Sequence, residues 1–227
     1  MITFMSSFTF RTAETADAER ILAFLCEHFV HEEPCIRAMK SNVDEWRPLL
    51  KEMVANSLRI PFSTIVTTEE GHVAAVLLNS LWRRDDESTG EDHENGSFPE
   101  HIQKFIDVLQ KCHGDFWPLA PADVNTVLYR EISNVGKPWQ RKGIASRMVT
   151  EALTKAKIDE YGVGGILSAT SSFANQTLLA KQGFQCLKEF PYADIVSCNG
   201  EQLVQTDDGS KGMRINFKRI EDFDINA

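Results

Sequence analysis

One stretch of the chain, NVGKPWQRKGIASRMVTEAL at residues 134–153, constrains the fold more than any other. A strand-like segment at 126–135 leads into QRKGIA at 140–145, and a long amphipathic segment follows. The start of a helix exposes unpaired backbone N–H groups and the positive end of the helix dipole. Because glycine and alanine keep bulky side chains away from that point, the pattern predicts a strand, a phosphate-binding turn and a helix.

The amino-acid sequence of this turn excludes two other classes of phosphate-binding loop. A Walker A loop needs GxxxxGK followed by Ser or Thr, and the sequence contains no such run. A dinucleotide-binding fold needs GxGxxG after its first strand, whereas this motif comes late in the chain and lacks that spelling. An ordinary helix start that contains a glycine remains an alternative.

Hydrophobic periodicity predicts strands and helices along the whole chain. Strands are expected at 3–11, 63–68, 72–82, 126–135, 162–170, 184–192 and 212–220. Helices are expected from Thr15 or Asp17 to the residues before Pro34, and at 42–57, 100–112, 144–158 and 172–182. Without a linker or an internal repeat, this order predicts one α/β domain over 1–227, with a central mixed sheet flanked by helices.

The segment RRDDESTGEDHENGS at 83–97 contains six acidic residues and no large apolar one. It predicts an exposed, flexible acidic insert at about 83–98, either a solvated insertion or an acidic gate over a cation site. The whole chain has a net charge of −9. This charge disfavours a nucleic-acid partner and favours cationic partners such as amines or basic peptides.

The five cysteines are widely spaced and form no CxxC pair, which predicts reduced thiols in a cytoplasmic protein. No apolar run of eighteen residues and no leader segment occur, so no membrane partner is expected. The HxxHEE run at 28–33 differs from the HExxH pattern of zinc enzymes, and no metal site is predicted. The sequence allows a monomer or a homodimer.

The Q-x-x-G-x-A spelling resembles the acetyl-CoA motif of the GCN5-related N-acetyltransferase (GNAT) family, written [RQ]-x-x-G-x-[GA]. The segments that follow, GGILSAT, SFANQTLLAKQ and Gly183-Phe184, also resemble that family's order of strand, short helix and Gly-Phe. The resemblance implies the single-domain GNAT fold and acetyl-CoA as cosubstrate. The cofactor-binding residues that it implies are Ser133, Asn134, Val135, Gln140, Arg141, Lys142, Gly143, Ile144, Ala145, Ser146 and Asn175.

The resemblance narrows at HFVHEEP, residues 28–34, and at FPYADIVSCNGEQL, residues 190–203. Both resemble segments of the insect-type arylalkylamine N-acetyltransferases, in which the glutamate before the proline is the catalytic base. Glu33 matches that glutamate, although a solvated carboxylate at a helix end remains an alternative. Ser171 matches a serine with a supporting catalytic role, and the alternative is that Ser171 and Ser172 only cap the next helix. Leu179 stands where many relatives have the tyrosine that protonates the leaving thiolate, so the general acid is not identified.

The resemblance therefore implies acetyl transfer to a small primary amine, first of all an arylalkylamine such as dopamine, tyramine or serotonin. Such an amine is mostly protonated near neutral pH and must lose a proton before it attacks the thioester, so Glu33 is expected to act as general base. Trp46, Phe62 and Trp82 are candidate walls for an aromatic amine. A polyamine or a peptide or lysine amine is an alternative acceptor, and a CoA-binding module without catalysis is the rival from another class.

Overall fold

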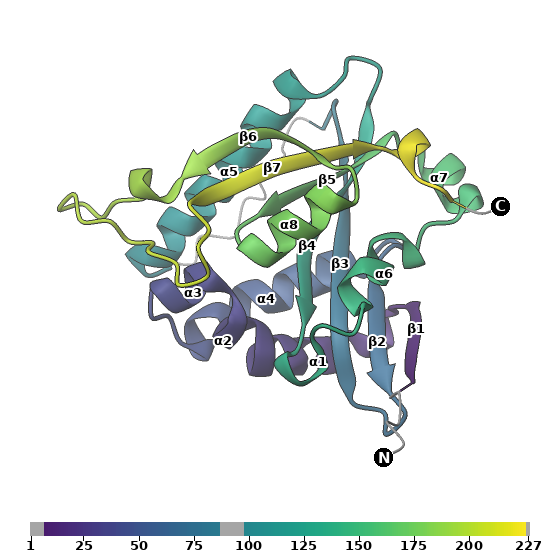
Figure 1. The fold of residues 1–227 in the computed structure, drawn as a ribbon, viewed down its shortest axis with the longest axis horizontal. Helices are drawn as coiled ribbons and strands as arrows, with labels where there is room; N and C mark the ends of the chain where they lie inside the picture. Colours follow the sequence, from purple (N-terminus) through teal and green to yellow (C-terminus); the bar gives the residue numbers. More distant parts are fainter. Residues whose placement is uncertain (1–6, 87–97, 226–227) are drawn as a thin grey trace.

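The structure, a computed structural model, describes residues 7–86 and 98–225. Its described part contains a seven-stranded mixed sheet in the order β1-β2-β3-β4-β5-β7-β6 (Figure 1). Only the central pair β4–β5 is parallel, and all other neighbours are antiparallel. The strands are β1 (Phe8–Thr12), β2 (Thr64–Thr68), β3 (Val73–Arg83), β4 (Thr126–Val135), β5 (Gly165–Thr170), β6 (Gln185–Pro191) and β7 (Gly212–Arg219).

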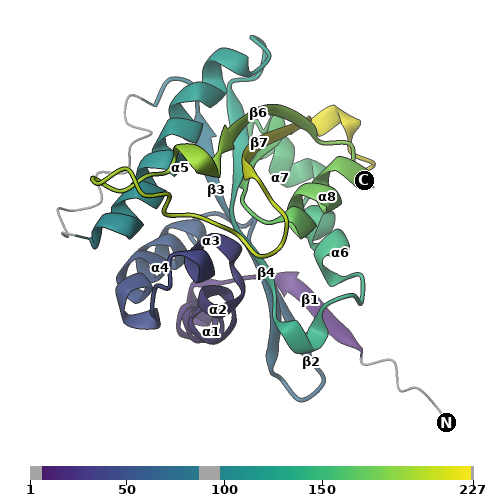
Figure 2. The same cartoon turned by 60° about the vertical axis from the view of Figure 1, so that its left-hand side comes forward.

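Helices cover both faces of this sheet (Figure 2). One face carries α1 (Ala18–Phe24), α2 (Val30–Glu32), α3 (Pro34–Ala38), α4 (Val43–Ser57) and α5 (Glu100–Leu119). The other face carries α6 (Ile144–Glu151), α7 (Lys155–Tyr161) and α8 (Phe173–Lys181). Short turns of helix are η1 (Thr15–Asp17), η2 (Leu25–Phe29), η3 (Lys137–Trp139), η4 (Tyr192–Asp194) and η5 (Ile220–Asp222). The predicted α/β fold with a flanked mixed sheet is confirmed.

Strands β4 and β5 separate after three residue pairs. The pairing covers only Val127–Gly165, Leu128–Ile166 and Tyr129–Leu167. Beyond it, β4 continues to Val135 beside β3, while β5 continues to Thr170 beside β7. The sheet therefore opens in a V between its two central strands, and the facing backbone groups of β4 lose their partner strand there.

A β-bulge lies on β4 at the start of this opening. Leu78 of β3 faces Ile132, and Asn79 faces Arg130, so Glu131 is an extra residue in the ladder. As a result, Tyr129 and Ile132 are buried in the same core, on the side of α1 and α4, although they are three residues apart. Leu128 and Val135 belong to cores on the side of α6. Because side chains otherwise alternate, Arg130 and Ser133 share the α6 side.

Two predicted helices have the wrong bounds. The helix expected at 144–158 is two helices, because Thr154 begins a new one: its Oγ1 accepts a hydrogen bond from the Lys157 N–H at 3.3 Å. The helix expected at 100–112 continues to Leu119, where the fully buried Phe116 anchors its last turns in the core. The strand predicted at 3–11 is tested only from residue 7 on, where β1 runs from Phe8 to Thr12, because residues 1–6 lie outside the described part.

The first predicted helix is regular only in its first half. Residues Leu25–Phe29 form a π-helical turn, and Glu33 leaves the helix with extended φ and ψ angles of −70° and 124°. A residue before proline avoids the helical region, so Pro34 explains this break. The predicted acidic insert at 83–98 lies mostly outside the described residues, since residues 87–97 are not among them.

None of the helices in the described ranges combines the length and the apolar character that crossing a membrane requires. All five cysteines are free, which agrees with the reduced thiols expected from the sequence.

Candidate active site

The Glu33 carboxylate is buried at the junction of α2 and α3. Its side chain is the N-cap of α3, and Oε2 accepts a hydrogen bond from the Ile36 N–H at 2.6 Å. Pro34 occupies the first position of that helix, where a missing N–H costs nothing. Glu33 is only 7% exposed, so it is not the solvated carboxylate that the sequence left as an alternative.

Burial raises the pKa of Glu33 above its ordinary value. The Ser171 hydroxyl, the backbone N–H groups of Ile36 and Cys35, and the charge of Arg37 act in the opposite direction without cancelling it. Oε1 of the carboxylate is buried and accepts no hydrogen bond of normal geometry from the described residues. A carboxylate in such surroundings takes up a proton more readily than one in water, which suits a general base.

A cavity of about 470 Å³ opens between β4, α6, α8 and the α2–α3 junction. We call it the loop cavity, because the loop before α6 forms one side of it. Its walls include both predicted catalytic residues, Glu33 and Ser171, and all but one of the predicted cofactor-binding residues: Ser133, Asn134, Val135, Gln140, Arg141, Gly143, Ile144, Ala145, Ser146 and Asn175.

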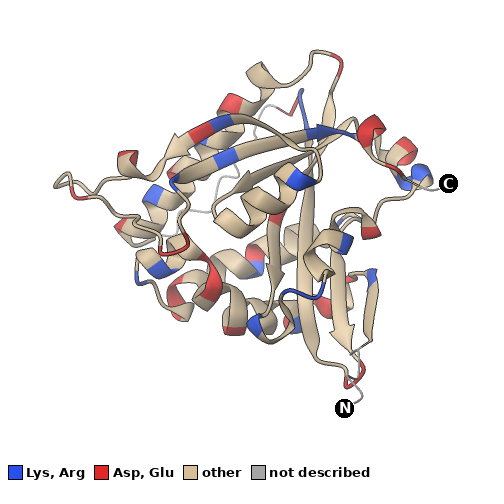
Figure 3. Cartoon of the chain, viewed as in Figure 1, with Lys and Arg blue, Asp and Glu red and all other residues tan. Residues whose placement is uncertain are grey.

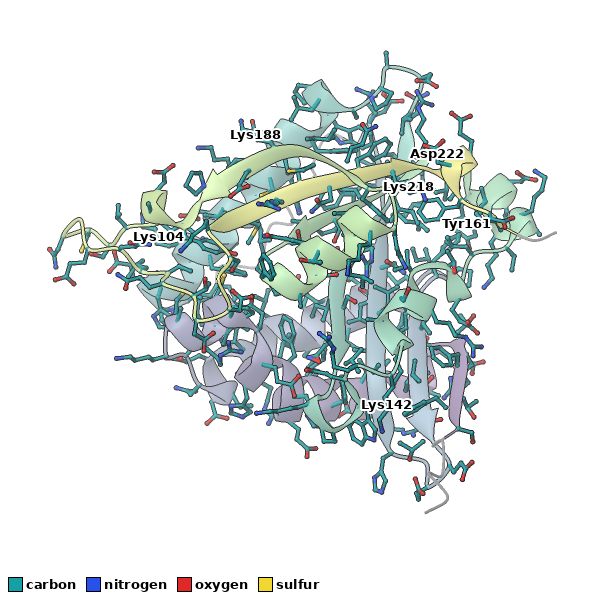
Figure 4. All side chains as sticks on the ribbon, in the orientation of Figure 1. Lys104, Lys142, Tyr161, Lys188, Lys218 and Asp222 are labelled. Carbon is teal, nitrogen blue, oxygen red and sulfur yellow. The ribbon has the colours of Figure 1, made fainter. Side chains whose placement is uncertain are left out.

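Lys142 is the predicted residue that the structure places outside the wall of the loop cavity. Its side chain is exposed and points toward β1, where Nζ lies 5.6 Å from the centroid of the Phe8 ring (Figure 4). Two adjacent basic residues, Arg141 and Lys142, therefore point in different directions from the same loop.

The backbone of this loop requires glycine at the start of α6. Gly143 is the N-cap of α6 and has φ of +81°, in the left-handed region that side chains disfavour. A Cβ at this position would meet no protein atom within 4 Å, so the space in front of the helix start is open. The start of α6 therefore presents backbone N–H donors beside the basic residues Arg141 and Lys142 of the preceding loop, which is blue in Figure 3, and this combination of groups suits an anion.

Glu32 holds this loop in place, a role that the sequence analysis missed. Its Oε1 accepts from the Lys137 N–H at 2.8 Å and lies 3.2 Å from Nδ1 of His28, while Oε2 accepts from Nε2 of Gln140 at 3.2 Å. Gln140 Nε2 also donates to the Val135 carbonyl at 2.9 Å. The spacing of His28 and Glu32, one helical turn apart, was the available signal. The two adjacent glutamates therefore differ: Glu32 holds the loop before α6, whereas Glu33 caps α3 and lines the loop cavity.

A second, smaller cavity of about 110 Å³ lies between α4, α5 and β4. We call it the inner cavity. Most of its wall is apolar or aromatic, and the residues include Phe29, Trp46, Leu49, Leu50, Met53, Phe105, Ile106, Leu109, Tyr129, Ile132 and Met213. Its polar wall residues include Gln110, His113 and Glu131. The two cavities share Phe29, Glu33, Ser133 and Ser171, so they meet at the predicted base.

Of the three aromatic residues proposed to wall an amine, only Trp46 lines the inner cavity. Phe62 is fully buried in the core beneath α7, where its ring contacts Tyr161. Trp82 lies behind the wall and stacks on Tyr129, with ring centroids 4.0 Å apart. Tyr129 itself was not predicted, because a tyrosine in a strand carries no signal that separates a core from a cavity wall.

Ser171 does not cap the helix that follows it. Ser172 is the cap of α8, and its Oγ accepts from the Asn175 N–H at 3.2 Å. The Ser171 carbonyl accepts a hydrogen bond from the Tyr192 hydroxyl at 2.7 Å, and the residue lines both cavities. The capping alternative therefore applies to Ser172, and Ser171 is left facing the junction.

The position of the usual general acid cannot serve the site. Leu179 is fully buried in the core with Leu128 and Phe184, and its neighbour Leu178 lines the loop cavity. Neither side chain carries a proton that could be given to a leaving group.

No family model matches the sequence, and no curated protein matches it. Solved structures, in contrast, match nearly the whole chain. Arylalkylamine N-acetyltransferase 2 from Aedes aegypti matches with a TM-score of 0.80 and 20% identity, covering 94% of this chain and 99% of that one. The chain has the GNAT fold.

Two further structures agree. A Drosophila melanogaster polyamine N-acetyltransferase, which catalyses formation of N-acetylagmatine, has a TM-score of 0.76 and 14% identity, with 94% of this chain and 100% of that chain covered. A Salmonella typhimurium protein assigned as an acetyltransferase, solved with acetyl-CoA, has a TM-score of 0.50 and 13% identity, with 98% of this chain and 97% of that chain covered. At these identities, the likeness establishes the fold.

Proposed function

We propose that this chain is an acetyl-CoA-dependent N-acetyltransferase that acts on a small primary amine. One observation carries the proposal: a large cavity beside a helix start and a small apolar cavity meet at a buried carboxylate, Glu33. Two substrates that enter from different sides would come together there. Holding two reactants in contact supplies a large part of the rate of such a reaction.

The loop cavity supports the binding of acetyl-CoA. The pyrophosphate would lie at the start of α6, where Gly143 leaves the space open and backbone N–H groups donate. The pantetheine arm would run along β4, whose backbone groups lose their strand partner where β4 and β5 separate. The acetyl group would then reach the junction at Ser133 and Ser171.

The chemistry would be a direct attack of the amine on the thioester. Glu33 takes the proton of the amine, directly or through water, and the nitrogen lone pair forms the new C–N bond. The thioester oxygen carries the negative charge of the intermediate until the C–S bond breaks and CoA leaves as its thiolate. The raised proton affinity of Glu33 favours the first step.

The inner cavity supports an arylalkylamine such as dopamine, tyramine or serotonin as the favoured acceptor. Its small volume and its aromatic wall, which includes Phe29, Trp46 and Phe105, fit a ring on a short amine chain. One observation favours a polyamine-like acceptor as the second candidate, namely the carboxylate of Glu131 in the same wall. The net charge of −9 would attract either class of cation.

The test is thiol release from acetyl-CoA with a panel of arylalkylamines, polyamines and basic peptides, together with CoA binding by calorimetry. Turnover with arylalkylamines is the expected result. Activity with polyamines or peptides alone would support the proposed acetyl transfer but contradict the arylalkylamine as its acceptor. Tight CoA binding without turnover on any amine would contradict the proposal and indicate a binding module.

A further inference from the structure

Arg130 is buried at the point where the sheet opens. It is the first residue of β4 after the last β4–β5 pair, and it is 3% exposed. Its Nη2 donates to the Ser133 hydroxyl oxygen at 3.1 Å. Within residues 7–86 and 98–225, Nε and Nη1 have no hydrogen-bond partner.

This guanidinium is a costly element of the fold. Burial lowers the pKa of Arg130 to about 10, and no carboxylate of the described residues offsets this effect. A buried charge without a partner destabilises a protein, and an apolar residue of similar size would be expected in its place. Residues that destabilise the fold in this way are often found at functional sites.

The bond to Arg130 determines what Ser133 can do. A hydroxyl group accepts with its lone pairs and donates with its single proton. Since the oxygen of Ser133 accepts from Arg130, its proton is left to point elsewhere. Ser133 lines both cavities, so the proton is available at the junction. Hydrogen bonding to a cation also makes the hydroxyl a stronger donor.

The two serines at the junction therefore differ in role. The Ser171 hydroxyl interacts with the Glu33 carboxylate, so it belongs to the side that receives the proton of the amine. Ser133 belongs to the side where negative charge would appear. The bulge at Glu131 makes this arrangement possible, because it places Arg130 and Ser133 on one face of β4 although they are three residues apart.

We propose that Ser133, polarised by Arg130, donates a hydrogen bond to the reacting thioester and stabilises the negative charge that develops there. The inference rests on the proposed acetyl transfer. The charge forms on the oxygen as the C–N bond forms and moves to sulfur as the C–S bond breaks. Glu33 receives the proton of the amine, and Ser133 keeps its own. Ser133 is thus a catalytic residue and Arg130 a positioning residue, and their hydrogen bond stabilises the leaving thiolate without the proton transfer that a general acid at position 179 would perform.

The experiment compares Ser133→Ala, Arg130→Met and the double variant with wild type. Ser133→Ala should lower kcat roughly 10-fold or more, with the KM for acetyl-CoA changed less than about 2-fold, since the bond strengthens only as charge develops. Arg130→Met should also lower kcat yet raise Tm, because it removes a buried charge. The double variant should be no slower than Ser133→Ala, because Arg130 acts through Ser133. Ser133→Thr, which keeps the hydroxyl, should recover most of the activity.

Arg84→Met is the matched control. The Arg84 guanidinium donates to the carbonyl groups of Trp117, Pro121 and Val124. Neither Arg84 nor these three residues are in the walls of the two cavities. This variant should lower Tm and leave kcat unchanged. Should Arg130→Met fail to fold, Arg130→Lys keeps a charge in the same place and should retain part of kcat.

The outcomes separate this inference from the proposed function. A wild type that turns over no amine would contradict both. An active wild type with an unchanged Ser133→Ala variant would contradict the role of Ser133 alone. If Arg130→Met lowered Tm, and if its loss of kcat multiplied with that of Ser133→Ala, Arg130 would have only a structural role and the inference would be wrong.

Discussion

The loop cavity and the inner cavity meet at Glu33 but are built in different ways. The wall of the loop cavity comes largely from one continuous stretch, residues 133–146, and from α8. That stretch acts through backbone geometry, since it offers the start of α6 and the edge of β4. The inner cavity is assembled from side chains on several elements, including η2, α4, α5, β4, β5 and β7, and its wall residues lie up to 184 positions apart, from Phe29 to Met213.

This difference indicates which of the two cavities can change its ligand specificity by substitution. A site formed by backbone groups depends on the conformation of a short segment, and few substitutions preserve it. A site formed by side chains can change its ligand by single substitutions without altering the fold. We therefore expect variants of the loop cavity to affect every acceptor equally and variants of the inner cavity to affect acceptors selectively.

The largest expected effect is at the junction itself. Glu33→Gln keeps the shape and most hydrogen bonds of Glu33 but removes its basicity, so kcat/KM should fall roughly 10²-fold or more for every amine. CoA binding, measured by calorimetry, should be unchanged. In wild type, kcat/KM should fall as the pH drops through a pKa above the ordinary range of glutamate, because the base must be deprotonated. A variant that retained this acidic limb would exclude Glu33 as its source.

In the loop cavity, adding a single methyl group at Gly143 should be enough to weaken acetyl-CoA binding. Gly143→Ala places a side chain where φ is +81°, which disturbs the start of α6, and the KM for acetyl-CoA should rise about 10-fold with all acceptors. Gly71→Ala is the matched control, since that residue has φ of +85° in the turn between β2 and β3 and also has open space around it. Steady-state kinetics should show no change in this control. Equal effects of the two variants on KM would assign the loss to general destabilisation.

Substitutions in the wall of the inner cavity should change the preference between amine acceptors. Glu131→Gln removes a charge from the wall, so kcat/KM for diamines should fall about 5-fold relative to that for tyramine. Competition between the two amines in one reaction measures the ratio directly. Trp46→Ala should lower kcat/KM for tyramine relative to that for diamines, because the aromatic ring of tyramine loses its contact with the Trp46 side chain. An equal loss for both amines in both variants would contradict the contrast between the cavities.

The smallest effect concerns stability. A carboxyl group whose pKa is raised by folding binds its proton more tightly in the folded state, so its contribution to stability is lost as the pH rises from the unfolded to the folded pKa. Glu33→Gln should therefore raise Tm by roughly 2–4 °C at pH 8 and by less at pH 5. Calorimetric unfolding at the two pH values tests this sign. A lower Tm at pH 8 would show that Glu33 stabilises the fold.

The same contrast explains what the sequence could predict. The motif at 140–145 and the Glu33-Pro34 pair are local signals, and local geometry places both on the wall of the loop cavity. Tyr129, His113 and Glu131 have no such signal, because only the tertiary fold brings their elements together around the inner cavity. The burial of Arg130 was hidden from the sequence for a related reason. An arginine in a strand looks exposed until the core on both faces is known.

The bulge on β4 has a consequence for how the acceptor site can evolve. Glu131 is the one residue of β4 without an opposite residue on β3, so losing it would leave the alternation of Arg130, Ile132 and Ser133 intact. The acid in the inner cavity thus sits on the residue that the ladder does not need. Loss of this single residue would alter the wall of the inner cavity and leave the residues on either side in their cores, so a deletion here is a route to new substrates.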